Sequence, residues 1–121
     1  MEHEWQIENA YASPGKFRRF AGKHPCEFDS LFANLEKIMR LLRTGNKVGS
    51  FRINFFRSEG EDVYRIGQTG VAGAKESRLY VLPIEQNRTM YVLTVGDKDS
   101  QERDVWEAKS IAKTIKSELS L

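Results

Sequence analysis

Two neighbouring apolar segments, residues 77–83 and 89–98, constrain the fold of this chain more than any other feature. Both are rich in β-branched and aromatic residues, a composition typical of strands, and a short polar loop joins them. Leu79 and Val81 alternate with other large apolar residues, so both faces of the first strand are apolar. We therefore expect the two strands to pair at the centre of a sheet whose faces are both at least partly covered.

A long amphipathic helix is predicted before the sheet. Pro25 suits the first turn of a helix, and Gly45 suits its end. The apolar residues between them recur at intervals of three and four and form one stripe, which contains Phe28, Leu31, Phe32, Leu35, Ile38, Met39 and Leu42. We expect this stripe to face the core.

A second helix is predicted near the C-terminal end. Asp99 can cap its first turn, and Glu102 occupies the reciprocal position of a capping box. The stripe predicted to be buried contains Val105, Ala108, Ile111, Ala112, Ile115 and Leu119.

Three weaker strands complete the predicted elements. Residues 50–57 alternate between apolar and polar, and residues 62–67 return as the second strand of a hairpin with its turn at 58–61. Residues 4–12 alternate weakly and favour a first strand with Trp5 and Ile7 facing the core.

These elements predict a single α+β domain over residues 1–121. The predicted domain has an antiparallel sheet of about four strands, an amphipathic helix before it and a C-terminal helix. We expect both helices to cover one face of the sheet and the other face to stay partly open.

Composition narrows the class of site. The chain has 121 residues, a formal net charge of +2, one cysteine and two histidines. One cysteine cannot form an internal disulfide and two histidines cannot build a zinc cluster unaided, so we expect a cytoplasmic location and a site without metal or cofactor. No apolar run is long enough to span a bilayer, so no membrane partner is expected. The weak positive charge does not by itself indicate a nucleic-acid binder.

The loop at residues 68–76 has a composition like that of a phosphate-binding loop, since glycines and a lysine follow a strand. That motif needs Lys directly after its last Gly, followed by Ser or Thr. Here Ala74 comes before Lys75, and Glu76 follows it. We therefore interpret the loop as a connection between strands and not as a nucleotide site.

Four segments, residues 63–66, 77–82, 90–98 and 105–109, together resemble the RelE/ParE toxin superfamily. Members of that superfamily have an arginine-bearing strand, a following apolar strand that ends in a basic turn after glycine, and a C-terminal helix. The resemblance implies a RelE-like toxin of a bacterial type II toxin-antitoxin system, an endoribonuclease that cleaves messenger RNA during translation. The implied partners are the ribosome, messenger RNA and a cognate antitoxin, either in a toxin-antitoxin hetero-oligomer or with the toxin as a homodimer.

Two alternatives remain open. ParE-like members of the superfamily poison gyrase, so the resemblance does not fix the activity. A non-catalytic domain that binds a partner protein or RNA belongs to a different class, and the near-neutral charge favours it.

The chemistry of a metal-independent ribonuclease selects candidate residues. The ribose 2′-hydroxyl must lose a proton, the pentacovalent phosphate must be stabilised, and the leaving 5′-oxygen must gain a proton. Arg78 is the candidate phosphate clamp and Lys98 a further positive charge, and Arg65 joins them if its strand neighbours that of Arg78. The alternative is that Arg78 only pairs with Glu76 or Glu85.

The remaining roles are less well defined by the sequence. Tyr80 or Trp106 would stack on an RNA base, unless Trp106 belongs to the core. No obvious general base exists, so Lys98, Arg103 or Asp99 would have to serve.

Phe56 interrupts the alternation of residues 50–57. It is predicted to point away from the core on an edge strand, where an antitoxin segment would dock. The alternative is burial of Phe56 by the region around Trp5.

Overall fold

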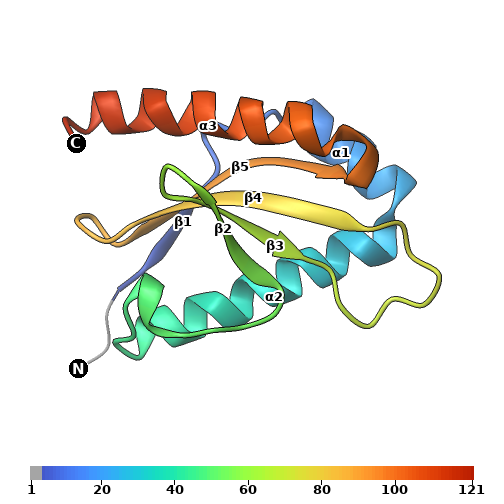
Figure 1. Cartoon of the computed structure of the whole chain (residues 1–121), viewed down its shortest axis with the longest axis horizontal. Coiled ribbons are helices and arrows are strands. Elements are labelled where there is room, and N and C mark those ends of the chain that lie inside the picture. The colour runs from blue at the N-terminus through green and yellow to red at the C-terminus, as the bar shows by residue number, and fades with distance from the viewer. Residues whose placement is uncertain (1–3) are drawn as a thin grey trace.

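Five strands form one mixed sheet, in the order β1-β5-β4-β3-β2, in the computed structural model, which describes residues 4–121 (Figure 1). The strands are β1 (Gln6–Glu8), β2 (Phe56–Gly60), β3 (Val63–Gly67), β4 (Ser77–Ile84) and β5 (Thr89–Asp97). The helices are α1 (Pro14–Lys23), α2 (Pro25–Arg43) and α3 (Gln101–Glu118), with short 3-10 helices η1 (Val48–Ser50) and η2 (Lys98–Ser100). The predicted α+β class is confirmed. β1 lies within the predicted strand of residues 4–12 and pairs in parallel with β5, so the sheet is mixed and five-stranded instead of antiparallel with about four strands.

The predicted central pair is confirmed as β4 and β5. They pair antiparallel along their length, with Leu79 opposite Val95 and Tyr80 opposite Thr94. Every residue of β4 is buried. The pair therefore forms the middle of the sheet, with β3 and β2 on one side and β1 on the other.

The two long helices lie on opposite faces of the sheet (Figure 1). The core cluster between α2 and the sheet includes Leu31, Leu35, Ile38, Ile66, Leu79 and Val81. The cluster between α3 and the sheet includes Tyr80, Leu82, Leu93, Ala108, Ala112 and Ile115. The prediction that both helices cover one face is wrong. Residues 79–84 of β4 are hydrophobic and point alternately to opposite faces, so each face needs its own helix.

The hairpin of β2 and β3 lies further along the chain than predicted. Residues 54 and 55 form a turn, so the strand begins at Phe56 and not near residue 50. Gly60 pairs with Val63, which leaves Glu61 and Asp62 as a two-residue turn with φ of 56° and 67°. Positive φ at both central residues is typical of a type I′ turn, whose twist matches that of the flanking strands. Here the two central residues are both acidic.

Phe56 is buried, with 8% of its surface exposed. Its ring stacks between Phe51, at 5.8 Å, and Tyr64, at 4.6 Å between ring centroids. The prediction that Phe56 is an exposed docking residue is therefore wrong, since the strand begins at this residue and its alternation is set from here.

A capping box precedes α3, but it differs from the predicted one. The Asp97 side chain accepts hydrogen bonds from the backbone N–H groups of Asp99 and Ser100. The Ser100 side chain accepts in return from the Asp97 N–H, which makes a capping box. The predicted box of Asp99 and Glu102 is thus replaced by one that caps η2.

None of the helices in residues 4–121 has the length and apolar character that a bilayer crossing requires.

Candidate functional site

A pocket of about 380 Å³ lies where β3 ends and β4 begins. We call it the arginine pocket, and it is lined by Asn54, Phe55, Arg57, Arg65, Gly67, Gln68, Thr69, Glu76, Ser77 and Arg78. Two of the predicted site residues, Arg65 and Arg78, are among them. Arg57 is a third arginine that the sequence did not identify.

Strand register brings the three arginines together. Arg57 lies opposite Arg65 in the β2-β3 pair, and Gly67 lies opposite Arg78 in the β3-β4 pair. Residues that pair across neighbouring strands point to the same face of the sheet, and so do residues two apart along one strand. All three arginines therefore lie on the side of the sheet that faces α3. The expectation that the strand of Arg65 neighbours that of Arg78 is confirmed.

Arg78 is buried, with 7% of its surface exposed. Its Nη2 donates to Glu76 Oε1 at 2.9 Å, which identifies Glu76 as the pairing partner instead of Glu85. Its Nη1 is buried and has no hydrogen-bond partner among residues 4–121. A buried guanidinium amino group without an acceptor is costly, so an oxygen acceptor that reached Nη1 would stabilise this arginine.

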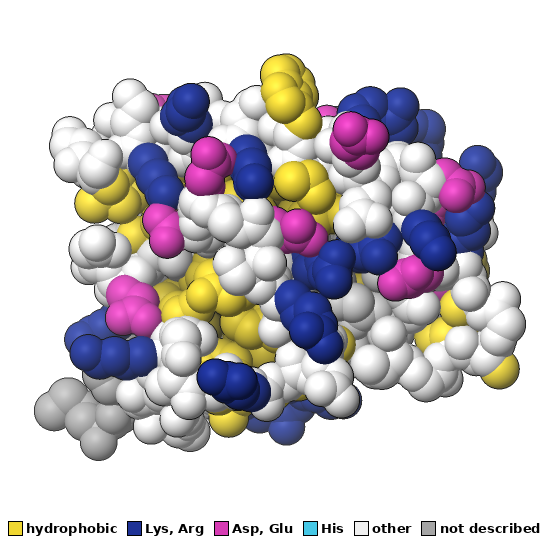
Figure 2. Space-filling view, in the orientation of Figure 1, with side chains coloured by type: hydrophobic (Ala, Val, Ile, Leu, Met, Phe, Trp, Pro, Cys, Tyr) yellow, Lys and Arg dark blue, Asp and Glu magenta, His cyan; other side chains and the backbone are white. Residues whose placement is uncertain are grey.

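The pocket carries an excess of positive charge. Arg65 Nη1 lies 3.3 Å from Glu59 Oε2, and Arg57 donates only to the backbone oxygen of Asn54, at 3.3 Å. Three guanidinium groups therefore face two carboxylates. Figure 2 shows Lys and Arg side chains gathered across the face on which β2 and β3 lie, with fewer Asp and Glu among them.

The other predicted catalytic residues lie outside the pocket lining. Lys98 is exposed in η2, where its backbone N–H donates to the Glu76 oxygen at 2.9 Å. Arg103 is exposed on the first turn of α3. Neither of these two side chains lines the arginine pocket.

The two predicted stacking residues have opposite environments. Tyr80 is 0% exposed and packs beneath α3, so its ring has no accessible face and the predicted stacking role is wrong. Burial raises the pKa of Tyr80 to about 12, so the phenol stays protonated. Trp106 is 72% exposed and is not part of the core, but it does not line the pocket.

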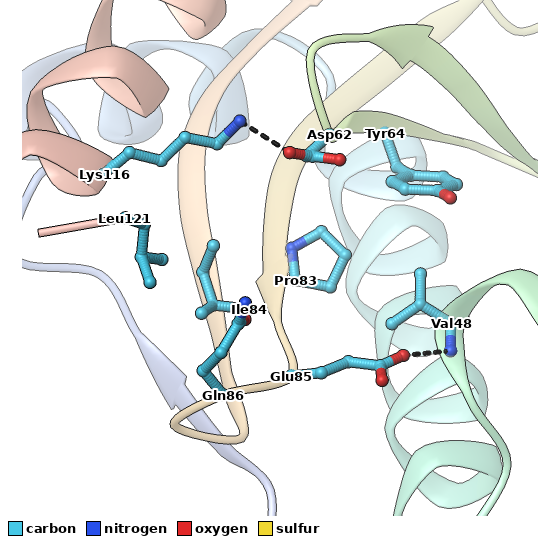
Figure 3. A pocket seen from close by; sticks show the side chains of 9 residues that line it. All are labelled: Val48, Asp62, Tyr64, Pro83, Ile84, Glu85, Gln86, Lys116 and Leu121. Atoms are coloured by element: carbon cyan, nitrogen blue, oxygen red, sulfur yellow. Dashed lines mark hydrogen bonds and ion pairs between the residues drawn. The ribbon is translucent and has the colours of Figure 1, made fainter. Parts of the chain in front are cut away.

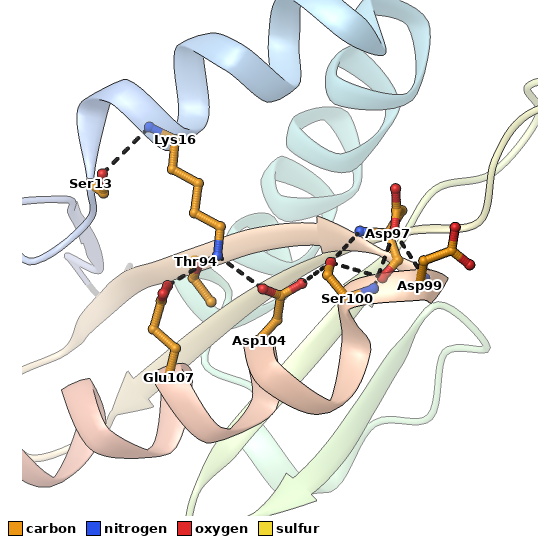
Figure 4. A network of polar contacts seen from close by, with 8 residues as sticks. All are labelled: Ser13, Lys16, Thr94, Asp97, Asp99, Ser100, Asp104 and Glu107. Atoms are coloured by element: carbon orange, nitrogen blue, oxygen red, sulfur yellow. Dashed lines mark hydrogen bonds and ion pairs between the residues drawn. The ribbon is translucent and has the colours of Figure 1, made fainter.

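A partly buried polar network joins α1 and β5 to the start of α3 (Figure 4). Lys16 of α1 donates to Thr94 Oγ1 at 2.7 Å, Asp104 Oδ1 at 2.9 Å and Glu107 Oε1 at 3.1 Å. Asp104 is 0% exposed and also accepts a hydrogen bond from Ser100. The one sequence signal for this network is an aspartate one turn before Ala108, at a position of the apolar stripe.

Glu107 stays ionised in this network. Burial alone would raise its pKa, but hydrogen bonds from Thr94 and Lys16 and the Lys16 charge outweigh burial and hold the pKa below its usual range. Lys16 thus faces two carboxylates and joins α1, β5 and α3 at one point. The charges of the network are paired with one another, and none of its residues lines the arginine pocket.

Gly96 leaves the room that this network needs. A Cβ on Gly96 would overlap Asp104 Oδ2 and lie 2.6 Å from Ser100 Oγ. We expect Gly96→Ala to lower the free energy of unfolding by roughly 1–3 kcal/mol, as overpacking of a buried site does. Urea denaturation of wild type and variant measures this.

Gly67→Ala is the matched control, because a Cβ there would meet nothing within 4 Å. Equal stability of the Gly96 and Gly67 variants would contradict the tight packing of Asp104 against β5.

A second pocket, of about 740 Å³, lies at the opposite end of β4 (Figure 3). Its charged groups already have partners: Asp62 pairs with Lys116 at 2.6 Å, and Glu85 accepts from the Val48 N–H at 2.8 Å. No buried group without a partner points into it among the described residues. The arginine pocket is therefore the stronger candidate.

No three His, Cys, Asp or Glu side chains within the described part of the chain are grouped so that they could hold a metal ion.

No family model, curated protein or solved structure matches this chain. Function is therefore inferred from the residues and geometry of the chain itself.

Proposed function

We propose that this protein is a RelE-like toxin, an endoribonuclease that cleaves messenger RNA during translation and is held inactive by a cognate antitoxin. The observation that carries the proposal is Arg78, a buried guanidinium whose Nη1 amino group has no partner among residues 4–121, in a pocket with Arg57 and Arg65. Such a group fits the phosphate of an RNA backbone.

The three arginines would act on the scissile phosphate. The 2′-oxygen bonds to phosphorus first, and negative charge builds on the pentacovalent phosphate. The bond from phosphorus to the 5′-oxygen then breaks, and the 5′-oxygen takes a proton from water. Arg78 would hold two phosphate oxygens, while Arg65 and Arg57 would stabilise the added charge. These interactions are stronger in the transition state than in the ground state, which is the condition for catalysis.

Glu76 is the carboxylate that lines the arginine pocket among residues 4–121, so it would take the proton from the 2′-hydroxyl once the phosphate has displaced it from Arg78. Asp99 is less suited. The hydrogen bond and charge of Lys75 hold the pKa of Asp99 below its usual range, which weakens it as a base. Lys98 and Arg103 lie outside the pocket lining, so they would act on the phosphate only at longer range.

The antitoxin would cover the arginine pocket from the β2 edge of the sheet. β2 is the last strand on its side, and Arg57 is exposed on it. An acidic antitoxin segment could pair with this edge and place carboxylates beside Arg57 and Arg65. Phe56 takes no part, because it is in the core.

Induced expression in bacteria tests the proposal. Wild type is expected to arrest growth and cleave messenger RNA, and Arg78→Ala is expected to reduce cleavage by about 10²–10³-fold, the usual loss on removal of one donor to a transition-state oxyanion. Arg78→Lys keeps the charge but loses the bidentate geometry, so it should recover only part of the activity. Arg40→Ala removes an exposed arginine of α2 and serves as the matched control.

Three results would contradict the proposal. They are a wild type that does not arrest growth, an Arg78→Ala variant that arrests it equally well, and arrest with intact messenger RNA but damaged DNA. The last result would instead identify a gyrase poison.

A non-catalytic protein- or RNA-binding domain is the second candidate. The observation that favours it is that Arg78 and Arg65 already have carboxylate partners, Glu76 and Glu59. A protein that binds RNA or a partner but leaves messenger RNA on translating ribosomes intact would support this second function.

A further inference from the structure

The outer face of α3 carries an exposed tryptophan. The residues of α3 that are buried against the sheet are Asp104, Ala108, Ala112 and Ile115. Trp106 lies on the opposite side of the helix and is 72% exposed, the largest exposed fraction among the large hydrophobic residues. Figure 2 shows a hydrophobic side chain that projects from the upper edge of the molecule, the edge along which α3 runs in Figure 1. Lys and Arg side chains lie on the same edge.

Cations flank Trp106 along the helix. Arg103 and Lys109 lie one turn away on either side, and Lys113 lies a further turn on. None of these three forms an ion pair with another residue in the range 4–121. Glu102 is the one acidic residue within a turn of Trp106 on this face, so the face is positive overall.

The chemistry of the face argues against a protein partner. Apart from Trp106, its exposed residues are Glu102, Arg103, Ser110, Lys113, Thr114 and Ser117. A protein that docks on a helix face uses several apolar anchors at intervals of three and four, and this face offers one. A single exposed ring among unpaired cations instead matches the way proteins hold single-stranded nucleic acid, by stacking on a base and neutralising phosphates.

We propose that the outer face of α3 binds single-stranded RNA, with a base stacked on Trp106 and neighbouring phosphates held by Arg103 and Lys113. The proposal rests on the proposed function for the choice of RNA. Arg103 and Lys113 are separated by about 15 Å along the helix axis, enough for a short run of nucleotides on either side of the stacked base. None of these residues lines the arginine pocket, so this face would anchor RNA and take no part in the chemistry.

The two tryptophans of the chain make the contact directly measurable. Trp5 is 6% exposed and Trp106 is 72% exposed. A short unstructured RNA oligonucleotide is expected to quench the emission of Trp106 and leave that of Trp5 unchanged. Trp106→Phe should bind the RNA with near wild-type affinity, measured by anisotropy of labelled RNA, but should show no quenching.

Trp106→Ala is expected to weaken RNA binding by roughly 5- to 150-fold, the effect of losing one base-aromatic stack. Ile7→Ala, which removes an exposed apolar residue of β1, is the matched control and should bind like wild type. Lys113→Ala should lower the slope of log affinity against log salt by about one, as for one lost phosphate contact.

The proposal is overturned if Trp106→Ala binds RNA as tightly as wild type, or if duplex RNA of the same sequence quenches Trp106 equally. It is also overturned if Trp106→Ala turns a dimer into a monomer with unchanged RNA affinity, since the face would then be a contact between two copies. Its failure is separable from failure of the proposed function. Loss of growth arrest in Arg78→Ala tests the pocket, whereas binding of free RNA tests α3.

Discussion

Phe56→Asp is expected to abolish the folded state. The Phe56 ring stacks between Phe51 and Tyr64 inside the cluster between α2 and the sheet. Loss of a buried phenylalanine ring costs about 3–5 kcal/mol, and a buried carboxylate without a partner adds several more. A domain has only about 5–15 kcal/mol of stability in total, so the sum is enough to unfold it.

Far-UV circular dichroism and the soluble fraction of the expressed protein measure this result. Phe56→Leu is the control, because it keeps the position apolar and should stay folded with a reduced midpoint of denaturation. A soluble, folded Phe56→Asp protein would mean that the side chain lies at the surface, which would restore the edge at Phe56 as a docking site for an antitoxin.

Lys16→Met is expected to lower the free energy of unfolding by about 3–5 kcal/mol, the effect of removing one partner from a buried ion pair. The ammonium group of Lys16 contacts Asp104, which is 0% exposed, and Glu107. Without it, the Asp104 carboxylate keeps the hydrogen bond from Ser100 but has no opposite charge. Urea denaturation of the purified protein gives the change.

Lys23→Met is the matched control, since Lys23 is an exposed lysine of the same helix and its replacement should change stability by less than about 0.5 kcal/mol. The double variant Lys16→Met with Asp104→Asn should recover part of the loss, because the uncompensated charge is then gone. If the double variant loses the sum of the two single effects, Lys16 and Asp104 are not coupled.

The centre of the sheet was predictable because β4 and β5 are long and apolar on both faces. Strands with two apolar faces are stable only inside a sheet that is covered on both sides. The same observation implied a helix on each face, but assigning both helices to one face ignored it. The N-terminal boundary of β2 was not predictable from alternation. A strand read from residue 50 places Phe56 on the wrong face, and the turn of Glu61 and Asp62 has no glycine at its centre.

The arginine pocket was predicted in part. Arg65 and Arg78 follow from the order of two adjacent strands, whereas Arg57 depends on the register of a hairpin whose turn was misplaced. Lys16 and Asp104 are 88 residues apart, and no periodic pattern relates a lysine of α1 to an aspartate of α3. Residue type alone could not predict which of Tyr80 and Trp106 is accessible to a ligand. Both are aromatic, and only the packing of the folded chain buries one ring and exposes the other.

The loop before β4 is fastened to η2 by two contacts. The Lys98 N–H donates to the Glu76 backbone oxygen, and Lys75 pairs with Asp99. An occupant of the arginine pocket that takes the place of Glu76 beside Arg78 therefore acts on a segment bonded to η2, the turn directly before α3. Residues 75–76 thus connect the arginine pocket to the turn from which α3 begins.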